Sequence, residues 1–371
     1  MFMKFIEKKL QFCSMIEIAK LLYHWYLKNK RDLPWRYTQN PYYIWVSEII
    51  LQQTRVEQGL PYYQKFIEYF PTIKLLAEAN EREVLSVWKG LGYYRRALNM
   101  HQAAKYVLND CNGQFPQTYN ELLKLKGVGE YTAAAIASIA FGEKTPVVDG
   151  NVIRVMSRIF MLDGDKNNLK FKRQLAEMIK PSMDFYNPSV INQGLMELGA
   201  LVCLPQKPTC SLCPINAYCK AYKANKIEQY PTASEKVKQK AIYFNYLIIT
   251  DFNHVLMQLR KDDDIWKNMY QFPLIEADKN FHLEELTQNT QFKKLFPRKM
   301  EFLYESKIYK HILSHRIIYA KYFIFKLIES DHYNFEKFNI QELDKLPLPR
   351  LIEKIKNDLV GLNDYLIKKR T

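Results

Sequence analysis

Apolar residues recur at helical spacing through the first part of the chain. From Ile16 to about Tyr222, stretches of ten to fifteen residues place apolar side chains three or four positions apart, which is the period of one face of a helix. Proline and glycine separate these stretches, and both residues interrupt helices. The pattern therefore predicts an all-α first domain.

The pattern changes after residue 240, where short apolar runs replace the helical period. Runs rich in Ile, Tyr, Phe and Val favour strands, and two segments between and after them keep a helical pattern. This mixture predicts an α+β second domain. We expect strands at residues 241–250, 254–260 and 317–327, and helices at 283–296 and 351–359.

A polar stretch separates the two patterns. Residues 221–240 are rich in Lys, Glu, Gln, Ser and Thr around a single proline, a composition typical of an exposed linker. The 371 residues, 48% of them hydrophobic, exceed what one core usually organises and suffice for two. We predict a helical domain at residues 1–222, a linker at 223–240 and an α+β domain at 241–371.

The net charge adds a partner class to this picture. A formal charge of +15 favours a polyanion, either nucleic acid or an anionic membrane surface. No run of eighteen apolar residues occurs, and four charged residues interrupt the first fifteen. The sequence therefore supports neither a membrane span nor a secretory signal, and we expect a soluble intracellular protein.

Four of the six cysteines lie within seventeen residues, in the spacing Cys203-x6-Cys210-x2-Cys213-x5-Cys219. Such clustering in a long chain argues for metal ligation over disulfides. Four thiolates hold either a structural zinc ion or an iron–sulfur cluster. Zinc ribbons usually present two C-x2-C pairs and this chain has one, so the spacing is not typical of a zinc ribbon. The remaining cysteines, at 13 and 111, are expected to be small buried residues.

A Gly-Val-Gly segment at residues 127–129 lies between a helix expected to end near Lys126 and one expected to start near Glu130. A tight turn needs glycine where φ is positive, and a second glycine lets backbone amides approach a phosphate at a helix N-terminus. From these residues alone, a phosphate clamp and an ordinary turn between helices stay equally open.

Two acidic residues are candidates for glycosidic bond cleavage. Glu48 shares a helical stripe with Trp45 and Leu51, so we expect burial to raise its pKa and keep it protonated; an exposed surface residue is the alternative. Asp149 precedes an apolar helix, where it could cap the helix, act in catalysis, or do both. Two carboxyls, one giving a proton and one stabilising the sugar cation, cleave such bonds.

Six segments of the chain stand out together: Leu33–Arg36, Ser47–Thr54, Gly90–Tyr94, Gly127–Ala133, Val148–Val152 and the cysteine cluster. Their order and spacing closely resemble the MutY family of A/G-specific adenine DNA glycosylases, in the helix-hairpin-helix superfamily. The resemblance covers essentially the whole chain and is stronger before residue 222. It implies an all-α helix-hairpin-helix glycosylase domain with a [4Fe-4S] cluster loop at residues 203–219, followed by an α+β Nudix-like domain.

The resemblance also implies an activity. Adenine opposite 8-oxoguanine or guanine would be flipped out of double-stranded DNA and excised, without a nucleotide cofactor. Glu48 would protonate adenine N7, and Asp149 would stabilise or trap the sugar cation with support from Tyr131 and Asn151. Bifunctional relatives such as endonuclease III carry a lysine where this chain has Tyr131, so a monofunctional enzyme is expected.

Further residues receive roles by the same matching. The adenine pocket would comprise Arg31, Trp35, Arg36 and Gln193. Contacts to DNA would come from Gln53, Thr54, Leu91, Tyr93, Gly127, Gly129, Ser314 and His315, and the cluster would be held by Cys203, Cys210, Cys213 and Cys219.

The second domain is expected to recognise 8-oxoguanine without hydrolysing nucleotides, because no helix carries the clustered glutamates that bind magnesium. Leu313 stands where the family has phenylalanine, which leaves the packing of the recognition turn open, although a branched apolar side chain can fill the same space. We expect a monomer that does not bind membranes and, in a bacterium, works in the cytoplasm at the nucleoid.

Two other functions remain to be distinguished. A pyrimidine-specific glycosylase or lyase on the same scaffold would be expected to have lysine at the position of Tyr131. A DNA-binding protein without catalysis could keep the hairpin and cysteines, but retention of both Glu48 and Asp149 counts against it.

Overall fold

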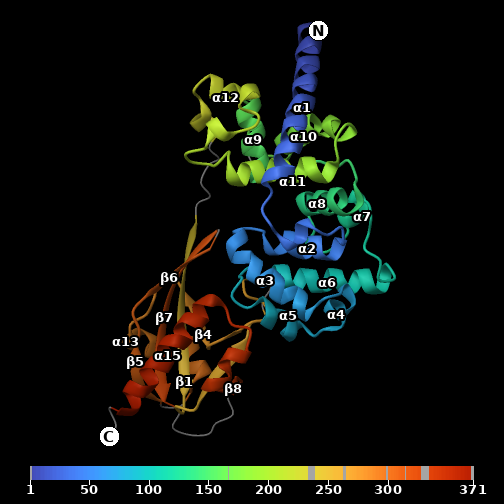
Figure 1. The fold of residues 1–371 in the computed structure, drawn as a ribbon. Coiled ribbons are helices and arrows are strands. Elements are labelled where there is room, and N and C mark those ends of the chain that lie inside the picture. The colour runs from blue at the N-terminus through green and yellow to red at the C-terminus, as the bar shows by residue number, and fades with distance from the viewer. Residues whose placement is uncertain are drawn as a thin grey trace. The chain divides into compact units, whose positions relative to one another are not determined.

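The computed structural model describes residues 2–165, 167–232, 239–261, 265–297, 300–313, 315–326 and 334–368 (Figure 1). The chain forms two compact units. One comprises Met1–Glu78 and Asn99–Glu235, and the other comprises Ala79–Leu98 and Lys236–Thr371. The second unit thus includes a segment from within the predicted first domain, and the predicted boundaries at residues 222 and 240 stay a prediction.

The described residues of the first unit form helices and loops, as the apolar period predicts. The α-helices are α1 (Phe2–Asn29), α2 (Pro41–Ile50), α3 (Val56–Tyr69), α4 (Ile73–Glu78), α7 (Tyr119–Leu122), α8 (Glu130–Phe141), α9 (Gly150–Phe160), α10 (Leu169–Ile179), α11 (Pro188–Leu201) and α12 (Lys220–Lys223), and α6 (Arg95–Asp110) crosses the division. The 3-10 helices are η1 (Pro34–Arg36), η2 (Lys180–Asp184), η3 (Cys210–Leu212), η4 (Asn216–Tyr218) and η5 (Ile227–Gln229).

Helix α11 lies at the centre of the first unit and packs against both α1 and α9. Its Leu195 and Leu198 are fully buried with Leu22 of α1 and Met156 of α9. Burial of this apolar core supplies most of the stability of such helices. The core therefore fixes α9 and α11, which carry several of the predicted site residues.

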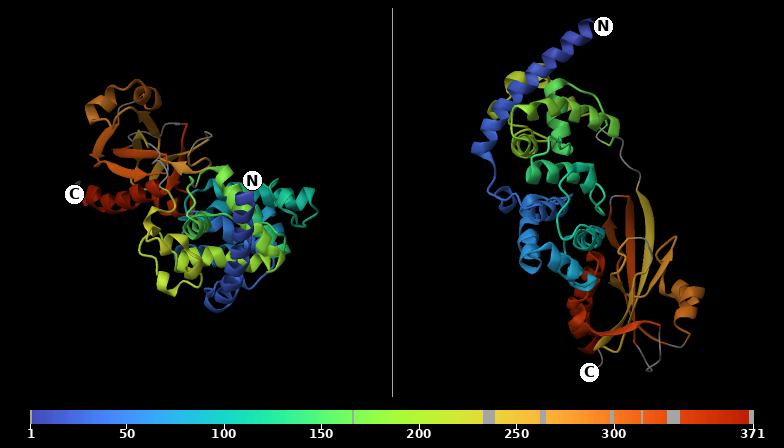
Figure 2. Two further views of the ribbon diagram at one scale, coloured as in Figure 1. Left: turned by 90° about the horizontal axis from the view of Figure 1, so that it is seen from above. Right: turned by 90° about the vertical axis from the view of Figure 1, so that its right-hand side faces the viewer.

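Helix α1 is longer than the predicted ten to fifteen residues. Its N-terminal end extends beyond the other helices of its unit (Figure 2). Cys13 lies before Met15, the first buried core residue described, and is exposed, while Cys111 is half-buried. The expectation that both of these cysteines are buried is wrong.

The Gly-Val-Gly segment forms a tight turn before α8. The preceding helix α7 ends at Leu122, earlier than the predicted Lys126, and the chain then passes through turns to Gly127. Gly127 has φ of +78°, and a Cβ there would lie 2.7 Å from Cβ of Asn99, so only glycine fits. Helix α8 begins at Glu130, as predicted.

The second unit contains the predicted strands in one mixed sheet. The strand order is β3-β2-β1-β7-β5, with β4 paired to β1, β6 to β7 and β8 to β2. β1 and β7 are parallel over eleven residue pairs, and the other pairings are antiparallel. The strands are β1 (Lys240–Thr250), β2 (His254–Leu259), β3 (Tyr270–Gln271), β4 (Leu274–Ala277), β5 (Glu301–Glu305), β6 (Tyr309–Ile312), β7 (Arg316–Lys326) and β8 (Glu336–Asn339).

Both faces of this sheet are covered by helices. Alternate side chains of β1 point to opposite faces: Tyr246 joins a core with Ile352 of α15 (Arg350–Lys368), and Leu247 joins another with Phe292 of α14 (Thr290–Leu295). The unit is therefore layered helix, sheet, helix. Its remaining helices are α5 (Glu81–Trp88), α13 (Leu283–Gln288) and η6 (Ile340–Lys345).

The helix predicted at residues 283–296 is two helices, α13 and α14. Asn289 between them has an extended backbone, and its side chain accepts hydrogen bonds from Gln291 N and Phe292 N. Asparagine is a favoured N-cap, which explains the break. No helix among the described residues has the length and apolar character needed to cross a bilayer.

Candidate active site

Glu48 is a buried acid in the last turns of α2. Asn40 caps this helix, since its side chain accepts from Tyr42 N, and Pro41 is the first helical residue. Only 7% of Glu48 is exposed, so the alternative of an exposed surface glutamate is wrong. Burial, with a smaller contribution from the charge of Asp149, raises the pKa of Glu48 to about 7.

Tyr131 lies beside this acid. Its hydroxyl donates a hydrogen bond to Glu48 Oε2 at 2.5 Å, which lowers the pKa of Glu48 against the effect of burial. Burial raises the pKa of Tyr131 well above its usual value, so the phenol remains a donor. Tyr131 belongs to the first turn of α8, and the turn at Gly127 therefore helps to position it.

Asp149 caps α9, which is one of the two roles that its sequence position left open. Its Oδ1 accepts from Val152 N at 2.7 Å, which caps α9, and its Oδ2 accepts from Asn151 Nδ2 at 2.8 Å. Burial raises the pKa of Asp149, and these two hydrogen bonds lower it in part. Its charge acts on both Glu48 and Tyr131, which shows that the three side chains share one site.

Asn151 is held in place by the close packing of α9 and α11. Its Oδ1 accepts from Arg154 Nη2 at 2.9 Å, and Arg154 Nε donates to the carbonyl of Cys203 at 2.7 Å. A Cβ at Gly199 would lie 2.6 Å from Cβ of Asn151. A side chain at Gly199 would therefore displace the residue that orients Asp149.

Arg31 and Arg36, both predicted to line the adenine pocket, meet at Glu197. Arg31 donates to Glu197 from its backbone N, Nε and Nη2 at 2.9, 3.0 and 2.9 Å, and Arg36 Nη2 donates to Oε2 at 2.5 Å. Arg36 Nη1 also donates to the Tyr26 hydroxyl at 3.1 Å. The positive charge of Arg36 lowers the pKa of Glu48, so this group lies within electrostatic reach of the acid.

The other two predicted pocket residues, Trp35 and Gln193, are also buried. In the sequence they lie close to Arg36 and Glu197, respectively. Trp35 is 6% exposed and packs edge-on against Tyr63, with the ring centroids 4.9 Å apart. Gln193 is 9% exposed, and its Nε2 donates to Ser189 Oγ at 2.9 Å. Gln193 lies one turn before Glu197 in α11, on the same face of that helix.

Sequence reasoning missed Glu197 and Arg154. A charged residue inside the apolar segment 195–198 of α11 was the available signal for Glu197, because buried charges are usually paired. Arg154 stands in the same way among the apolar residues of α9. Neither residue lies within any of the six segments that carry the family resemblance.

The predicted DNA contacts fall in both units. Gln53, Thr54, Gly127 and Gly129 belong to the first, and Leu91 and Tyr93 to the second. Gln53 and Tyr93 have φ of 59° and 49°, a strained region for residues with side chains that is enriched at functional sites. Leu91 is buried and Tyr93 is half exposed. His315 is exposed, and Ser314 lies outside the described residues.

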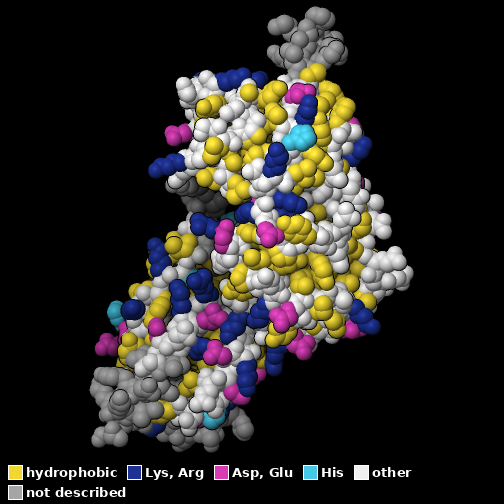
Figure 3. Space-filling model, in the orientation of Figure 1, with side chains coloured by type: hydrophobic (Ala, Val, Ile, Leu, Met, Phe, Trp, Pro, Cys, Tyr) yellow, Lys and Arg dark blue, Asp and Glu magenta, His cyan; other side chains and the backbone are white. Residues whose placement is uncertain are grey.

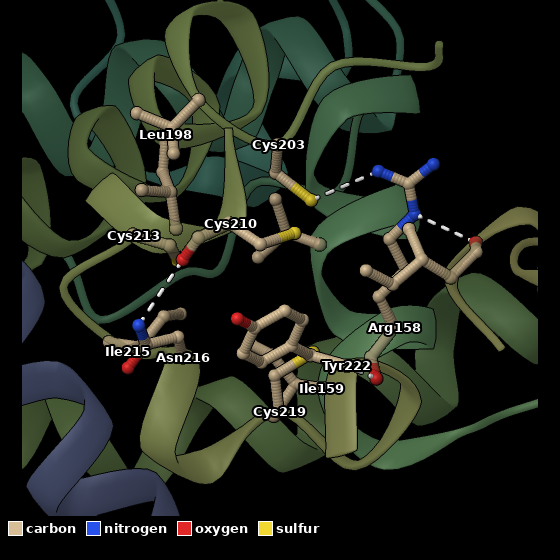
Figure 4. A pocket seen from close by; sticks show the side chains of 13 residues that line it. Arg158, Ile159, Leu198, Cys203, Cys210, Cys213, Ile215, Asn216, Cys219 and Tyr222 are labelled. Carbon is tan, nitrogen blue, oxygen red and sulfur yellow. Dashed lines mark hydrogen bonds between the residues drawn. The ribbon is translucent and has the colours of Figure 1, made fainter. Parts of the chain in front are cut away.

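All four clustered cysteines line one pocket (Figure 4). Its walls include apolar side chains of α9 and α11, such as Val155 and Leu198. The guanidinium of Arg158 is buried, and its Nη1 donates to Cys203 Sγ at 3.3 Å. Burial raises the pKa of the Cys213 thiol to about 12.

The four thiols lie around this pocket, and the charge of Cys203 acts on each of the other three. Within the described ranges, no three His, Cys, Asp or Glu side chains are grouped as a site for a single metal ion. The residues present fit a [4Fe-4S] cluster: four thiolates, apolar walls and a buried cation.

Comparison with known proteins gives this site a family. Residues 46–181 match a model of the HhH-GPD superfamily base excision DNA repair protein, and residues 245–358 match a NUDIX domain. The adenine DNA glycosylase of Buchnera aphidicola subsp. Baizongia pistaciae (strain Bp) is 36% identical over 80% of this chain and 82% of that protein. The chain belongs to the adenine DNA glycosylase family. It is a DNA glycosylase, which hydrolyses N-glycosyl bonds.

Other adenine DNA glycosylases are similar to larger or smaller parts of this chain. The enzyme of Buchnera aphidicola subsp. Acyrthosiphon pisum (strain APS) is 32% identical over 91% of this chain and 96% of its own. The Homo sapiens enzyme is 42% identical over 56% of this chain and 40% of its own.

A solved structure supports the fold of the helical part. A thermostable thymine-DNA glycosylase matches with a TM-score of 0.52 and 30% identity, over 57% of this chain and 97% of that one. The predicted helix-hairpin-helix domain followed by a Nudix-like domain is confirmed.

Proposed function

We propose that this chain excises adenine mispaired with 8-oxoguanine or guanine in double-stranded DNA, in base excision repair of oxidative damage. The observation that carries the proposal is the acid Glu48, buried and with its pKa raised to about 7, beside Tyr131 and Asp149. An acid titrating near neutrality gives up its proton efficiently at the pH of the cell. That the excised base is adenine is inferred from the relatives, which are adenine DNA glycosylases.

The two carboxyls would divide the reaction between them. Glu48 would protonate N7 of the flipped adenine, which makes the base a better leaving group. Asp149, held by Val152 N and Asn151, would stabilise or capture the oxocarbenium-like sugar, and water would complete hydrolysis. Arg31, Trp35, Arg36 and Gln193 would surround the base.

Tyr131 bears on the product that the reaction leaves. A lyase forms a Schiff base through a lysine, and the phenol of Tyr131 cannot form one. Its hydroxyl is instead engaged by Glu48. We propose that the enzyme is monofunctional and leaves an abasic site.

The second unit would recognise the oxidised base through Ser314 and His315. Leu313, which replaces the phenylalanine of the family, packs against the core that contains Tyr246 and Ile352. A branched apolar side chain therefore occupies this position. Gln53, Thr54, Leu91 and Tyr93 would contact the DNA from the two units, with the hairpin glycines at the phosphates.

The charge of the chain agrees with a DNA substrate. Lys and Arg side chains recur across the face drawn in Figure 3, and the net charge is +15. Such a surface supplies the sequence-independent part of DNA affinity. We propose a monomer that acts on duplex DNA and, in a bacterium, works at the nucleoid in the cytoplasm.

The test of the proposed function is a single-turnover assay on four duplexes, each analysed with and without alkali. They carry adenine opposite 8-oxoguanine, adenine opposite guanine, thymine glycol, or uracil. We expect strand cleavage only at the mispaired adenine, only after alkali, and faster opposite 8-oxoguanine than opposite guanine. Cleavage at thymine glycol without alkali would move the chain to the lyases, and equal rates opposite the two guanines would reject recognition of 8-oxoguanine.

We also propose that Cys203, Cys210, Cys213 and Cys219 hold a [4Fe-4S] cluster. The cluster would hold the loop 203–219 in place, and Lys207 in this loop and Lys220 directly after it would then meet phosphates. Support comes from the shared pocket of Figure 4, its apolar walls and the buried Arg158 beside Cys203.

Replacing Cys213 with Ser is expected to abolish the brown colour, the visible absorption and the bound iron and sulfide of protein reconstituted without oxygen, because serine is a poor ligand for this cluster. Cys111→Ser is the matched control, since Cys111 is half-buried and lies outside the loop, and it should keep all four signals. A colourless parent protein with one zinc per chain would refute the cluster.

A further inference from the structure

Glu197 is a buried carboxylate that contacts two arginines of the adenine pocket at once. Only 1% of it is exposed. Arg31 engages both carboxylate oxygens from its side chain, and Arg36 Nη2 shares Oε2 with it. Burial alone would raise the pKa of Glu197, but the Arg31 hydrogen bonds and the Arg36 charge lower it below its usual value. The carboxylate is therefore charged at neutral pH.

The same arginine also faces the catalytic acid. The groups that act on Glu48 are the Tyr131 hydroxyl from α8, the Asp149 carboxyl at the start of α9, and the Arg36 guanidinium from η1. Arg36 is the positively charged member of this set. A positive charge beside a buried acid favours loss of the proton, which opposes the role of Glu48 as a proton donor.

In this pocket an arginine lies beside the proton donor. The pocket therefore needs an anion that reduces the effect of the arginine on that acid. An arginine keeps its charge in a protein interior, so only a neighbouring anion can reduce its field. Glu197 meets Arg36 from the side of α11 and has its second partner in Arg31. We propose that Glu197 is a positioning residue that fixes both guanidinium groups in the pocket and neutralises Arg36, so that Glu48 keeps its proton in the resting enzyme.

This inference rests on the proposed roles of Glu48 and Arg36, and it is tested without DNA. The protein is prepared with glutamate labelled at the side-chain carboxyl carbon, and the Glu48 resonance is identified by its loss in Glu48→Gln. In Glu197→Gln, which keeps the size of the side chain, we expect Glu48 to titrate at lower pH than in the parent.

The matched control is Glu57→Gln. Glu57 is exposed and lies 4.0 Å from Arg31, so its replacement removes the same charge from the same arginine without touching Arg36. We expect this variant to leave the Glu48 titration and the excision rate at parent values.

A second pair of variants separates neutralisation from general disturbance. Glu197→Gln combined with Arg36→Met contains neither charge, and the Glu48 titration should return to the parent value or above it. Glu197→Asp keeps the negative charge, so Glu48 should titrate at a pH between the values of Glu197→Gln and the parent. If Glu197→Gln does not fold, Arg36→Met alone is measured against the parent, and it should raise the pH at which Glu48 titrates.

Excision kinetics supply an independent readout. In Glu197→Gln the falling limb of the single-turnover pH profile should move to lower pH, and the rate on its alkaline side should drop about tenfold for each pH unit of that movement. Unchanged titration of Glu48 in Glu197→Gln, or in Arg36→Met, would overturn the inference even if adenine is excised. A shifted titration in a protein that excises another base would leave the inference standing and reject the proposed substrate.

Discussion

Glu48→Gln is expected to lower the single-turnover rate of adenine excision by about 10²- to 10⁴-fold, which is the usual contribution of a general acid. Glutamine has the size of glutamate but no proton to give to adenine N7. Binding of the mispaired duplex, measured by gel shift, should persist because the carboxyl does not hold the DNA backbone. Turnover at the parent rate would remove Glu48 from the proposed role.

The pH dependence of stability gives a check on the same residue. Burial raises the pKa of Glu48 from 4.5 to about 7. Between these values the folded state binds more protons than the unfolded state, so the free energy of unfolding decreases as the pH rises. Glutamine does not ionise, so the free energy of unfolding of Glu48→Gln should not decrease in this way. At pH 8 the variant should be more stable than the parent by about 3 kcal/mol at most. Urea unfolding at pH 5 and pH 8 measures the difference, with the exposed Glu57→Gln as the control.

Asp149→Asn is expected to reduce excision by about 10²- to 10³-fold, the scale seen when one group that stabilises transition-state charge is removed. Asparagine caps helices as well as aspartate does, so α9 should keep its stability. The variant therefore removes the charge and keeps the hydrogen bond to Val152 N. Excision is measured in single-turnover assays and stability by thermal unfolding.

The partner variant Asp149→Ala loses both the charge and the cap. It should match Asp149→Asn in excision and be less stable by about 1 kcal/mol. If Asp149→Asn kept parent activity while Asp149→Ala lost it, the residue would serve only as the cap of α9.

The sequence predicts the features of this enzyme that depend on local pattern. The stripe shared by Glu48, Trp45 and Leu51 predicts burial of the acid, and the helix period predicts the all-α unit. The glycine at 127 predicts a turn with positive φ. In each case the pattern of neighbouring residues is enough to predict the feature.

Features that depend on distant residues were not predictable in the same way. Arg31 and Glu197 lie 166 positions apart, so nothing in a single sequence pairs them. The break at Asn289 was missed because the helical period continues across it, although its side chain caps the next helix. The end of α7 at Leu122 was missed because the apolar pattern continues into the turns after it.

The parallel pair in the second sheet has a consequence for biosynthesis. Every residue of β1 meets a partner in β7 at a constant offset of 76 positions, from Lys240 opposite Arg316 to Thr250 opposite Lys326. At the usual speed of a ribosome, that offset corresponds to about 4–15 s of translation. During this interval one edge of the apolar strand β1 has no native neighbour to pair with, and an unpaired edge is a template for aggregation. The yield of active enzyme in a cell thus depends on how that edge is protected during synthesis, independently of the chemistry at Glu48.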